Sequence, residues 1–249
     1  MIHPCRFVYP YFENPEMLKL QVENWNRYDD YLRDLIRIII VDDHSPESPV
    51  PILKNCRMDV QCYRLNERFP WNMHECRNIG AKHASTPDEN HWLFMCDMDN
   101  LLPPEEAFSM LWRELDPSRH YSMERVFAPD MVERCTHGNT FLVKYEAFWQ
   151  VNGYDLDLTP IGGGGYGASD YEFIVQLNEV ATRMHMTDVT LIGYGRRTGD
   201  GEPFLPDADT RSLDRAEWSS RFAQARDRKR KSGDMRSVHP IRTSYERVL

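Results

Sequence analysis

Two carboxylates directly follow a strongly apolar segment of this sequence. The run Trp92–Cys96 has the length of a buried strand, and Asp97 and Asp99 come straight after it. In an α/β protein, the carboxyl ends of parallel strands form the edge of the sheet where ligands bind. Carboxylate oxygens at this edge suit Mg²⁺ or Mn²⁺ held against a phosphate. The alternative is that both residues only end the strand, because aspartate favours turns.

A third carboxylate stands later in the chain, after a glycine-rich segment. Residues 161–167 contain five glycines, and Asp170 follows at the start of a predicted helix. An aspartate there can project into a cleft as a general base, provided that it comes within about 3 Å of the hydroxyl that loses its proton. The alternative is a simple helix cap. The glycine run is either a loop that closes over a ligand or a disordered connection.

Alternating strand and helix patterns would position these residues. Apolar runs predict strands at 6–9, 36–41, 60–65, 140–143, 189–192 and immediately before Asp97. Amphipathic patterns predict helices at 15–31, 71–83, 104–115, 170–181 and 215–231. The alternation indicates an α/β fold with a mostly parallel central sheet flanked by helices.

Composition and charge limit the classes of protein. The 249 residues are 41% hydrophobic, which is typical of a globular chain, and the formal net charge of −9 argues against general nucleic-acid binding. The segment 221–236 is the exception, because it carries seven basic and two acidic residues. It is either a solvated helix or a docking surface for an anionic acceptor such as DNA, or for a membrane face.

The cysteines and the lack of membrane signals favour a cytoplasmic protein. The six cysteines form no C-x-x-C pair, and several lie within apolar patterns, as buried free thiols do. No segment has the length of a membrane span, and the N-terminus lacks the apolar core of a signal peptide. We therefore expect free thiols, a cytoplasmic location and no transmembrane segment.

Four blocks of the first half resemble glycosyltransferases of the GT-A fold, a Rossmann-like fold that transfers sugars from nucleotide donors. The blocks are Val8–Phe12, Ile39–Ser45, Cys76–Gly80 and Asp97–Asp99. The resemblance implies a GT-A domain over residues 1–205, with a nucleotide-binding half at 1–102 and an acceptor-binding half at 103–205. A basic, helical C-terminal extension at 206–249 would follow it.

The resemblance also implies roles for individual residues. Asp97 and Asp99 match an Asp-x-Asp motif that binds a metal ion, Mn²⁺ or Mg²⁺, and the diphosphate, and Asp170 is the expected catalytic base. The expected nucleotide-sugar contacts are Pro10, Tyr11, Asp43, Trp71, Arg77, Asp97 and Gly165. Tyr11 and Trp71 have the alternative of being core aromatics, and Arg77 that of a surface residue near a helix start.

The second half resembles inverting β-1,4-galactosyltransferases and chondroitin-type polymerases, but it departs from their acceptor pocket. The similar blocks are 139–144, 151–154 and 165–170. Ser169 stands where that family has a Glu that contacts the acceptor sugar, and Tyr166 replaces a Trp that lines the pocket. Both departures fall on positions that contact or line the acceptor pocket in that family.

A further departure concerns the metal. The segment 191–197 lacks the metal-binding His that the galactosyltransferases place there. His185 or His239 could serve instead, although a lone His is more often structural. Arg196 and Arg197 could aid the diphosphate if the role of the His has been replaced.

These features together predict a metal-assisted, inverting glycosyltransferase. The donor would be a nucleotide sugar, expected to be a UDP-sugar, and the acceptor a hydroxyl of a glycan or of a modified DNA base bound through 221–236. One alternative is a nucleotidyltransferase, which the sequence after the first strand disfavours because it lacks a glycine-rich basic loop. Another is a sugar-nucleotide-binding module that has lost catalysis.

Overall fold

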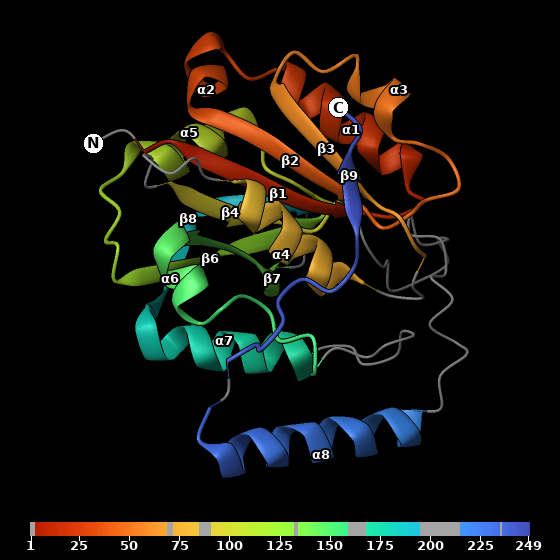
Figure 1. The fold of residues 1–249 in the computed structure, drawn as a ribbon. Coiled ribbons are helices and arrows are strands. Elements are labelled where there is room, and N and C mark those ends of the chain that lie inside the picture. Colours follow the sequence, from red (N-terminus) through yellow and green to blue (C-terminus); the bar gives the residue numbers. More distant parts are fainter. Residues whose placement is uncertain are drawn as a thin grey trace.

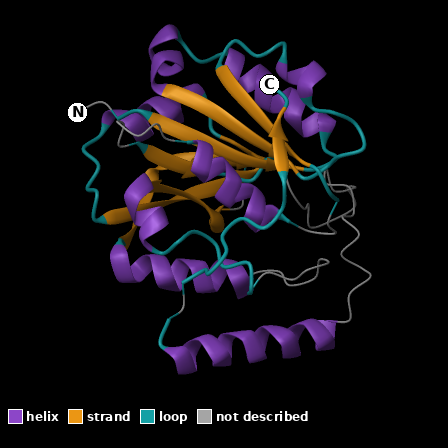
Figure 2. Cartoon of the chain, viewed as in Figure 1, coloured by secondary structure: helices purple, strands orange, loops and turns teal. Residues whose placement is uncertain are grey.

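A mixed β-sheet forms the centre of the protein in the computed structural model, with helices on both of its faces (Figures 1 and 2). The structure describes residues 3–68, 72–84, 91–131, 134–158, 168–194, 215–234 and 236–249. Within these residues the sheet has nine strands, in the order β5-β8-β6-β7-β4-β1-β2-β3-β9.

Strands and helices largely alternate in the first half of the sequence and follow one another less regularly in the second half. The strands are β1 (Cys5–Tyr11), β2 (Ile36–Asp42), β3 (Asp59–Leu65), β4 (Trp92–Met95), β5 (Asn100–Leu101), β6 (Arg119–Phe127), β7 (Arg134–Lys144), β8 (Thr182–Gly193) and β9 (Tyr245–Arg247). The helices are α1 (Pro15–Asn26), α2 (Asp30–Leu35), α3 (Val50–Leu53), α4 (Met73–His83), α5 (Pro104–Trp112), α6 (Tyr145–Gln150), α7 (Ala168–Val180) and α8 (Arg215–Ser232).

The predicted α/β architecture is confirmed, and the sheet is mixed. Parallel pairs join β1 to β2, β1 to β4, β2 to β3 and β6 to β8. Antiparallel pairs join β3 to β9, β4 to β7, β5 to β8 and β6 to β7. Three of the four parallel pairs join strands of the alternating first half of the sequence, as that pattern predicts, and the fourth joins β6 to β8.

Two apolar cores lie on the two faces of the sheet, because the central strands bury both sets of alternating side chains. In β1, Phe7 belongs to the core beneath α1, α2, α3 and α5, whereas its neighbour Val8 belongs to the core beneath α4, α6 and α7. In β2, Ile38 and Ile39 divide in the same way. The continuous apolar runs of these strands therefore follow from their position in the middle of the sheet.

The predicted helix over 15–31 is two helices, because a second capping residue interrupts it. The side chain of Asn14 accepts a hydrogen bond from the backbone of Met17 and caps α1. The side chain of Asp29 accepts one from the backbone of Leu32, at 2.8 Å, and starts α2. Between them, the buried Tyr28 donates its hydroxyl to the backbone oxygen of Leu102. A sidechain cap inside an apolar pattern is enough to end one helix and begin another.

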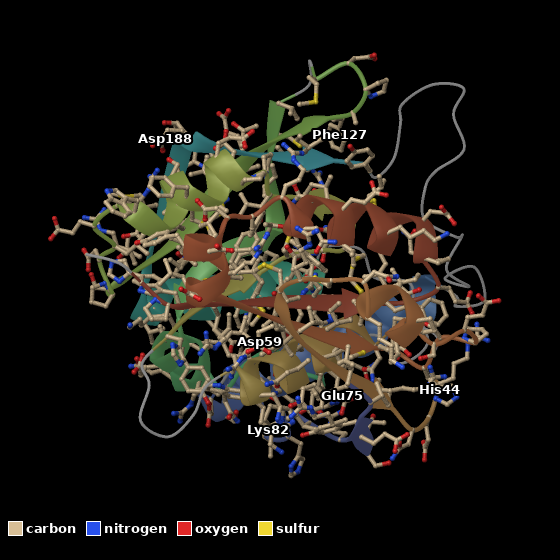
Figure 3. All side chains as sticks on the ribbon, turned by 90° about the horizontal axis from the view of Figure 1, so that it is seen from above. His44, Asp59, Glu75, Lys82, Phe127 and Asp188 are labelled. Carbon is tan, nitrogen blue, oxygen red and sulfur yellow. The ribbon has the colours of Figure 1, made fainter. Side chains whose placement is uncertain are left out.

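The C-terminal part includes a strand that the sequence pattern does not predict. After α8, the chain returns along α4 and adds β9 to the edge of the sheet beside β3 (Figure 1). Glu75, labelled in Figure 3 with Lys82 of the same helix, accepts hydrogen bonds from the backbone of Arg242 and from the backbone and hydroxyl of Thr243. The end of the chain is thus tied to the first half of the protein.

Ion pairs hold α8 beside α7. Arg226 lies 2.9 Å from the buried carboxylate of Glu172 in α7, and Lys229 pairs with Asp155 and, at 3.4 Å, with Asp157. Among the residues that the structure describes, no helix is both long enough and apolar enough to cross a bilayer. All six cysteines are free thiols.

Gly80 lets α4 approach β1 closely, and its replacement tests that contact. A Cβ at Gly80 would overlap with Cγ1 of Val8, in a strand that cannot move away because both its edges are paired. We expect Gly80→Ala to lower the free energy of unfolding by about 1–3 kcal/mol, the usual cost of overpacking. Chemical denaturation would measure it, with Gly138→Ala as the matched control, because nothing lies within 4 Å of a Cβ there. Equal stability of the two variants would contradict the close contact.

Candidate active site

The Asp97–Asp99 turn lies at the carboxyl end of β4 and is fixed by backbone hydrogen bonds on both sides. The backbone of Cys96 donates to the oxygen of Val8 at 3.1 Å, and the backbone of Tyr194 donates to the oxygen of Asp99 at 2.8 Å. Burial alternates along this turn: Asp97 and Asp99 are partly exposed, and Met98 between them is buried. Two carboxylates of one turn are therefore both partly accessible.

The electrostatics of this turn favour a cation. Burial, and then the negative charge of Asp97, raise the pKa of Asp99 to about 6, against opposing effects of Arg125 and Arg77. Such a rise reports that two carboxylates repel each other in a poorly hydrated place. Mg²⁺ and Mn²⁺ are often held by one or two carboxylates together with substrate phosphates.

The donor set is compatible with such an ion only if a substrate completes it. Within the described residues, no group of three or more His, Cys, Asp or Glu side chains is arranged to hold a metal ion. Asp97 and Asp99 supply oxygen ligands of the right kind, so the residues present fit an ion whose remaining ligands are phosphate oxygens and water.

Arg77 joins this turn to the third predicted carboxylate. One end of its guanidinium, Nη2, pairs with Oδ1 of Asp97, and the other, Nη1, lies 3.6 Å from Oδ1 of Asp170. Arg77 is only 1% exposed, so it lies inside the site and is not a surface residue. Burial opposes its charge, but Asp97 and Asp170 raise the pKa of Arg77 above its ordinary value. Asp97 and Asp170, which are 73 positions apart in the sequence, thus belong to one cluster, and Asp99 lies in the same turn as Asp97.

Asp170 is held in its ionised form by its neighbours. Burial raises the pKa of Asp170, but His74, Arg77 and Asn139 together hold it well below the ordinary value. Nε2 of His74 donates to Oδ1 of Asp170 at 2.7 Å. The carboxylate stands in the first turn of α7, and 18% of its side chain remains exposed. It is an ionised, accessible proton acceptor beside the Asp97–Asp99 turn.

A second acidic position lies at the ends of β1 and β2. The backbone of Asp43 donates to the oxygen of Tyr11, the residue that follows Pro10 in β1, at 2.9 Å. Oδ2 of Asp43 accepts from the backbone of Asn72, whereas Oδ1 is buried and has no partner among the described residues. Burial is the main cause that raises the pKa of Asp43 to about 7. Within the described part of the chain, Oδ1 of Asp43 therefore remains available to accept a hydrogen bond.

The two histidines predicted as possible metal ligands lie in β8 and after α8. His185 of β8 pairs in register with Ser122 of β6, Ser122 with Phe141 of β7, and Phe141 with Met95 of β4. His185 therefore lies three strands from β4, about 14 Å across the sheet. The structure does not bring it to the Asp97–Asp99 turn. His239 is exposed, in the segment that runs along α4.

Several predicted residues lie outside the part of the chain that the structure describes. These are Trp71, the glycine-rich segment 161–167 with Gly165 and Tyr166, and Arg196 and Arg197; the side chain of Ser169 is outside it as well. Their predicted roles stay predictions.

The structure adds site residues that the sequence analysis missed. His74 precedes Arg77 by three positions, a spacing that puts both on one face of α4, and this was the available signal. Arg125 lies in β6, which ends at Phe127 (Figure 3), and its Nη1 donates to the side chain of Asn100 at 3.3 Å. No pattern in the sequence predicted β6, so nothing connected Arg125 to the Asp97–Asp99 turn.

The bridging position of Arg77 leads to a stability prediction. Arg77→Met would leave two half-buried carboxylates without their shared cation, and breaking a buried pair in this way costs about 3 kcal/mol or more. We expect that loss in the free energy of unfolding, measured by chemical denaturation. The control is Arg113→Met, because Arg113 pairs with Asp188 at the surface and should cost less than about 1 kcal/mol. Similar losses in both variants would argue against the bridge.

Comparisons with known proteins agree with this architecture. A family model described as "Glycosyl transferase family 2" matches residues 9–168. No curated protein sequence is significantly similar to the chain. The folds of several solved structures are similar at low sequence identity. One is the mannosyltransferase PcManGT from Pyrobaculum calidifontis in complex with GDP-Man and Mn²⁺, with 14% identity, a TM-score of 0.59, and coverage of 94% of this chain and 77% of that chain.

Two further structures have the same fold. S. aureus TarS 1-349 in complex with UDP-GlcNAc has 11% identity and a TM-score of 0.62, with coverage of 91% of this chain and 72% of that chain. GalNAc-T7 with UDP, GalNAc and Mn²⁺ has 13% identity and a TM-score of 0.59, with coverage of 77% of this chain and 44% of that chain. The identities are low, so these structures identify the fold and no more.

Proposed function

Because this chain belongs to glycosyl transferase family 2, and so transfers a sugar from a nucleotide-sugar donor, we propose that it does so with a divalent metal ion and with inversion at the sugar carbon. One observation carries the proposal: Arg77 places Asp170 beside the Asp97–Asp99 turn. A proton acceptor next to a place for a metal-bound diphosphate is what single displacement at a sugar carbon requires.

The residues divide the chemistry between them. Asp170 takes the proton of the acceptor hydroxyl while the hydroxyl oxygen bonds to the sugar carbon. The bond between the sugar carbon and the diphosphate oxygen breaks at the same time, and its electron pair stays on that oxygen. Arg77 fixes the two carboxylates relative to each other. A Mn²⁺ or Mg²⁺ ion held by Asp97 and Asp99 would supply Lewis-acid stabilisation of the charge on the leaving group.

We propose a UDP-sugar as the donor. Oδ1 of Asp43, a residue whose backbone bonds to that of Tyr11, has no partner among the described residues and is suited to accept a hydrogen bond from the N–H of a base. The TarS structure is a complex with UDP-GlcNAc and that of GalNAc-T7 a complex with UDP, whereas PcManGT is in complex with GDP-Man, so both bases belong in the test.

The proposed acceptor is a hydroxyl of a glycan, with a modified DNA base as the second candidate. Arg228, Arg230 and Lys231 of α8 are exposed, whereas Arg226 and Lys229 of the same helix pair with acidic residues of the protein. An anionic acceptor would bind to these three exposed basic residues, and the affinity of the protein for that acceptor would then fall steeply as the salt concentration rises.

A donor screen tests the proposal. The purified chain would be incubated with UDP- and GDP-sugars, Mn²⁺ and a panel of glycan and DNA acceptors, and the products identified by mass spectrometry. We expect transfer from a UDP-sugar that stops when EDTA removes the metal, and a product of inverted anomeric configuration by NMR. Calorimetric binding of UDP-sugar without any turnover would instead support a binding module without catalysis.

A further inference from the structure

His74 is buried next to the proposed catalytic base, and no role is yet assigned to it. It lies in the first turn of α4, and its ring packs against Tyr154 with the centroids 4.8 Å apart. Nε2 of His74 is 2.7 Å from Oδ1 of Asp170, a residue 96 positions later in the chain. Because an ionised carboxylate only accepts hydrogen bonds, Nε2 carries the hydrogen and donates it.

Exposure separates the roles of the two residues. The side chain of Asp170 is 18% exposed, whereas that of His74 is 3% exposed. An acceptor hydroxyl can therefore reach the carboxylate but not the imidazole. His74 acts on the reaction only through Asp170.

We propose that His74 is a positioning residue, which fixes the Asp170 carboxylate so that one of its lone pairs points at the acceptor hydroxyl. This inference rests on the proposed function of Asp170 as the base. A carboxylate has about four sites for hydrogen-bond donors, and among the described residues the groups that surround Asp170 are His74 and Arg77 of α4, Asn139 of β7 and the ring of Tyr154. Three of these described groups donate to it or pair with it, so they do not occupy all of its sites, and the acceptor hydroxyl is proposed to take a remaining one.

The proposed arrangement gives His74 no part in the proton balance. The hydroxyl proton moves to Asp170 as the sugar carbon–oxygen bond forms, and it leaves for solvent after the product dissociates. His74 keeps its own hydrogen throughout. Without His74, the carboxylate can rotate about its side-chain torsions, and the lone pair spends less time aimed at the hydroxyl.

Two variants of His74 separate positioning from folding. His74→Ala removes the donor, and we expect kcat to fall about 30-fold to 300-fold while KM for the donor sugar nucleotide stays within about threefold. His74→Gln keeps an N–H near the position of Nε2, and we expect it to restore kcat to within about tenfold of the wild type. A change confined to kcat, with rescue by the conservative variant, is what positioning predicts.

His120→Ala is the matched control. His120 is another buried histidine, and its Nε2 donates to the side chain of Asn178 at 2.9 Å, about 12 Å along α7 from Asp170. We expect His120→Ala to lower thermal stability without lowering kcat at a temperature where both variants are folded. Equal loss of kcat in His74→Ala and His120→Ala, or no rescue by His74→Gln, would overturn the inference.

The wild-type assay separates this inference from its premise. If the wild type transfers sugar and His74→Ala matches its kcat, the inference is wrong and the proposed function stands. If the wild type transfers no sugar under any donor and metal condition, the proposed function is wrong, and the inference falls with it.

Discussion

Asp170→Asn should lower kcat for sugar transfer about 10²-fold to 10⁴-fold, the usual contribution of a general base. The amide nearly matches the carboxylate in shape but cannot take the proton of the acceptor hydroxyl. Donor binding should change little, because the Asp97–Asp99 turn keeps its own backbone contacts. Steady-state kinetics with saturating donor and Mn²⁺ would measure the effect, with calorimetry of UDP binding beside it.

The control for this variant must make the same change of charge at an aspartate outside the proposed site. Asp188→Asn does so, since Asp188 is 64% exposed and pairs only with Arg113 among the described residues. Wild-type kcat in Asp188→Asn and a large loss in Asp170→Asn is the expected result. If Asp170→Asn retained more than a tenth of the wild-type kcat, Asp170 would not be the base.

Asp99→Asn should lower kcat/KM at least about 10³-fold and abolish the response to added Mn²⁺. The neutral amide is a much weaker ligand for a divalent cation, and the diphosphate would leave without the charge stabilisation worth several kcal/mol. The variant also removes the repulsion between Asp99 and Asp97, which, after burial, raises the pKa of Asp99. Its free energy of unfolding should therefore be equal to or above that of the wild type, although activity is lost.

Mn²⁺ titrations followed by activity and by calorimetry in the presence of UDP would measure this loss. Asp59→Asn serves as the control, because Asp59 is 52% exposed and lies at the amino end of β3, whereas Asp97 follows the carboxyl end of β4. An Asp99→Asn variant that still responds to Mn²⁺ like the wild type would show that another group holds the ion.

The central elements could be predicted because their position in the fold determines their pattern. The run from Ile38 to Val41 is apolar on both faces, since β2 lies between β1 and β3 with a core on each side. The same reason identified β4, and with it the Asp97–Asp99 turn. Strands without that pattern were missed: β6 mixes polar and apolar residues, and β9 has only three residues and depends on pairing with β3.

The convergence of the site could be proposed from resemblance but not from local pattern. Asp97 and Asp170 lie on different elements, and it is Arg77 of a third element that joins them. His74 looked like any polar residue of an amphipathic helix, because its partner is 96 positions away. Long-range polar contacts of this kind have no period in the sequence, so only coordinates reveal them.

The last strand of the sheet has a consequence for how the protein is made. The side chains of Asn66 and Ser244, which flank the pairing of β3 with β9, are 178 positions apart. During translation, β3 therefore leaves the ribosome long before its partner and waits with one unpaired edge, which is a known opening for aggregation. Contacts of such sequence separation also form slowly. We expect chains that end before residue 240, and so lack β9, to bind chaperones more strongly than the chain that contains it.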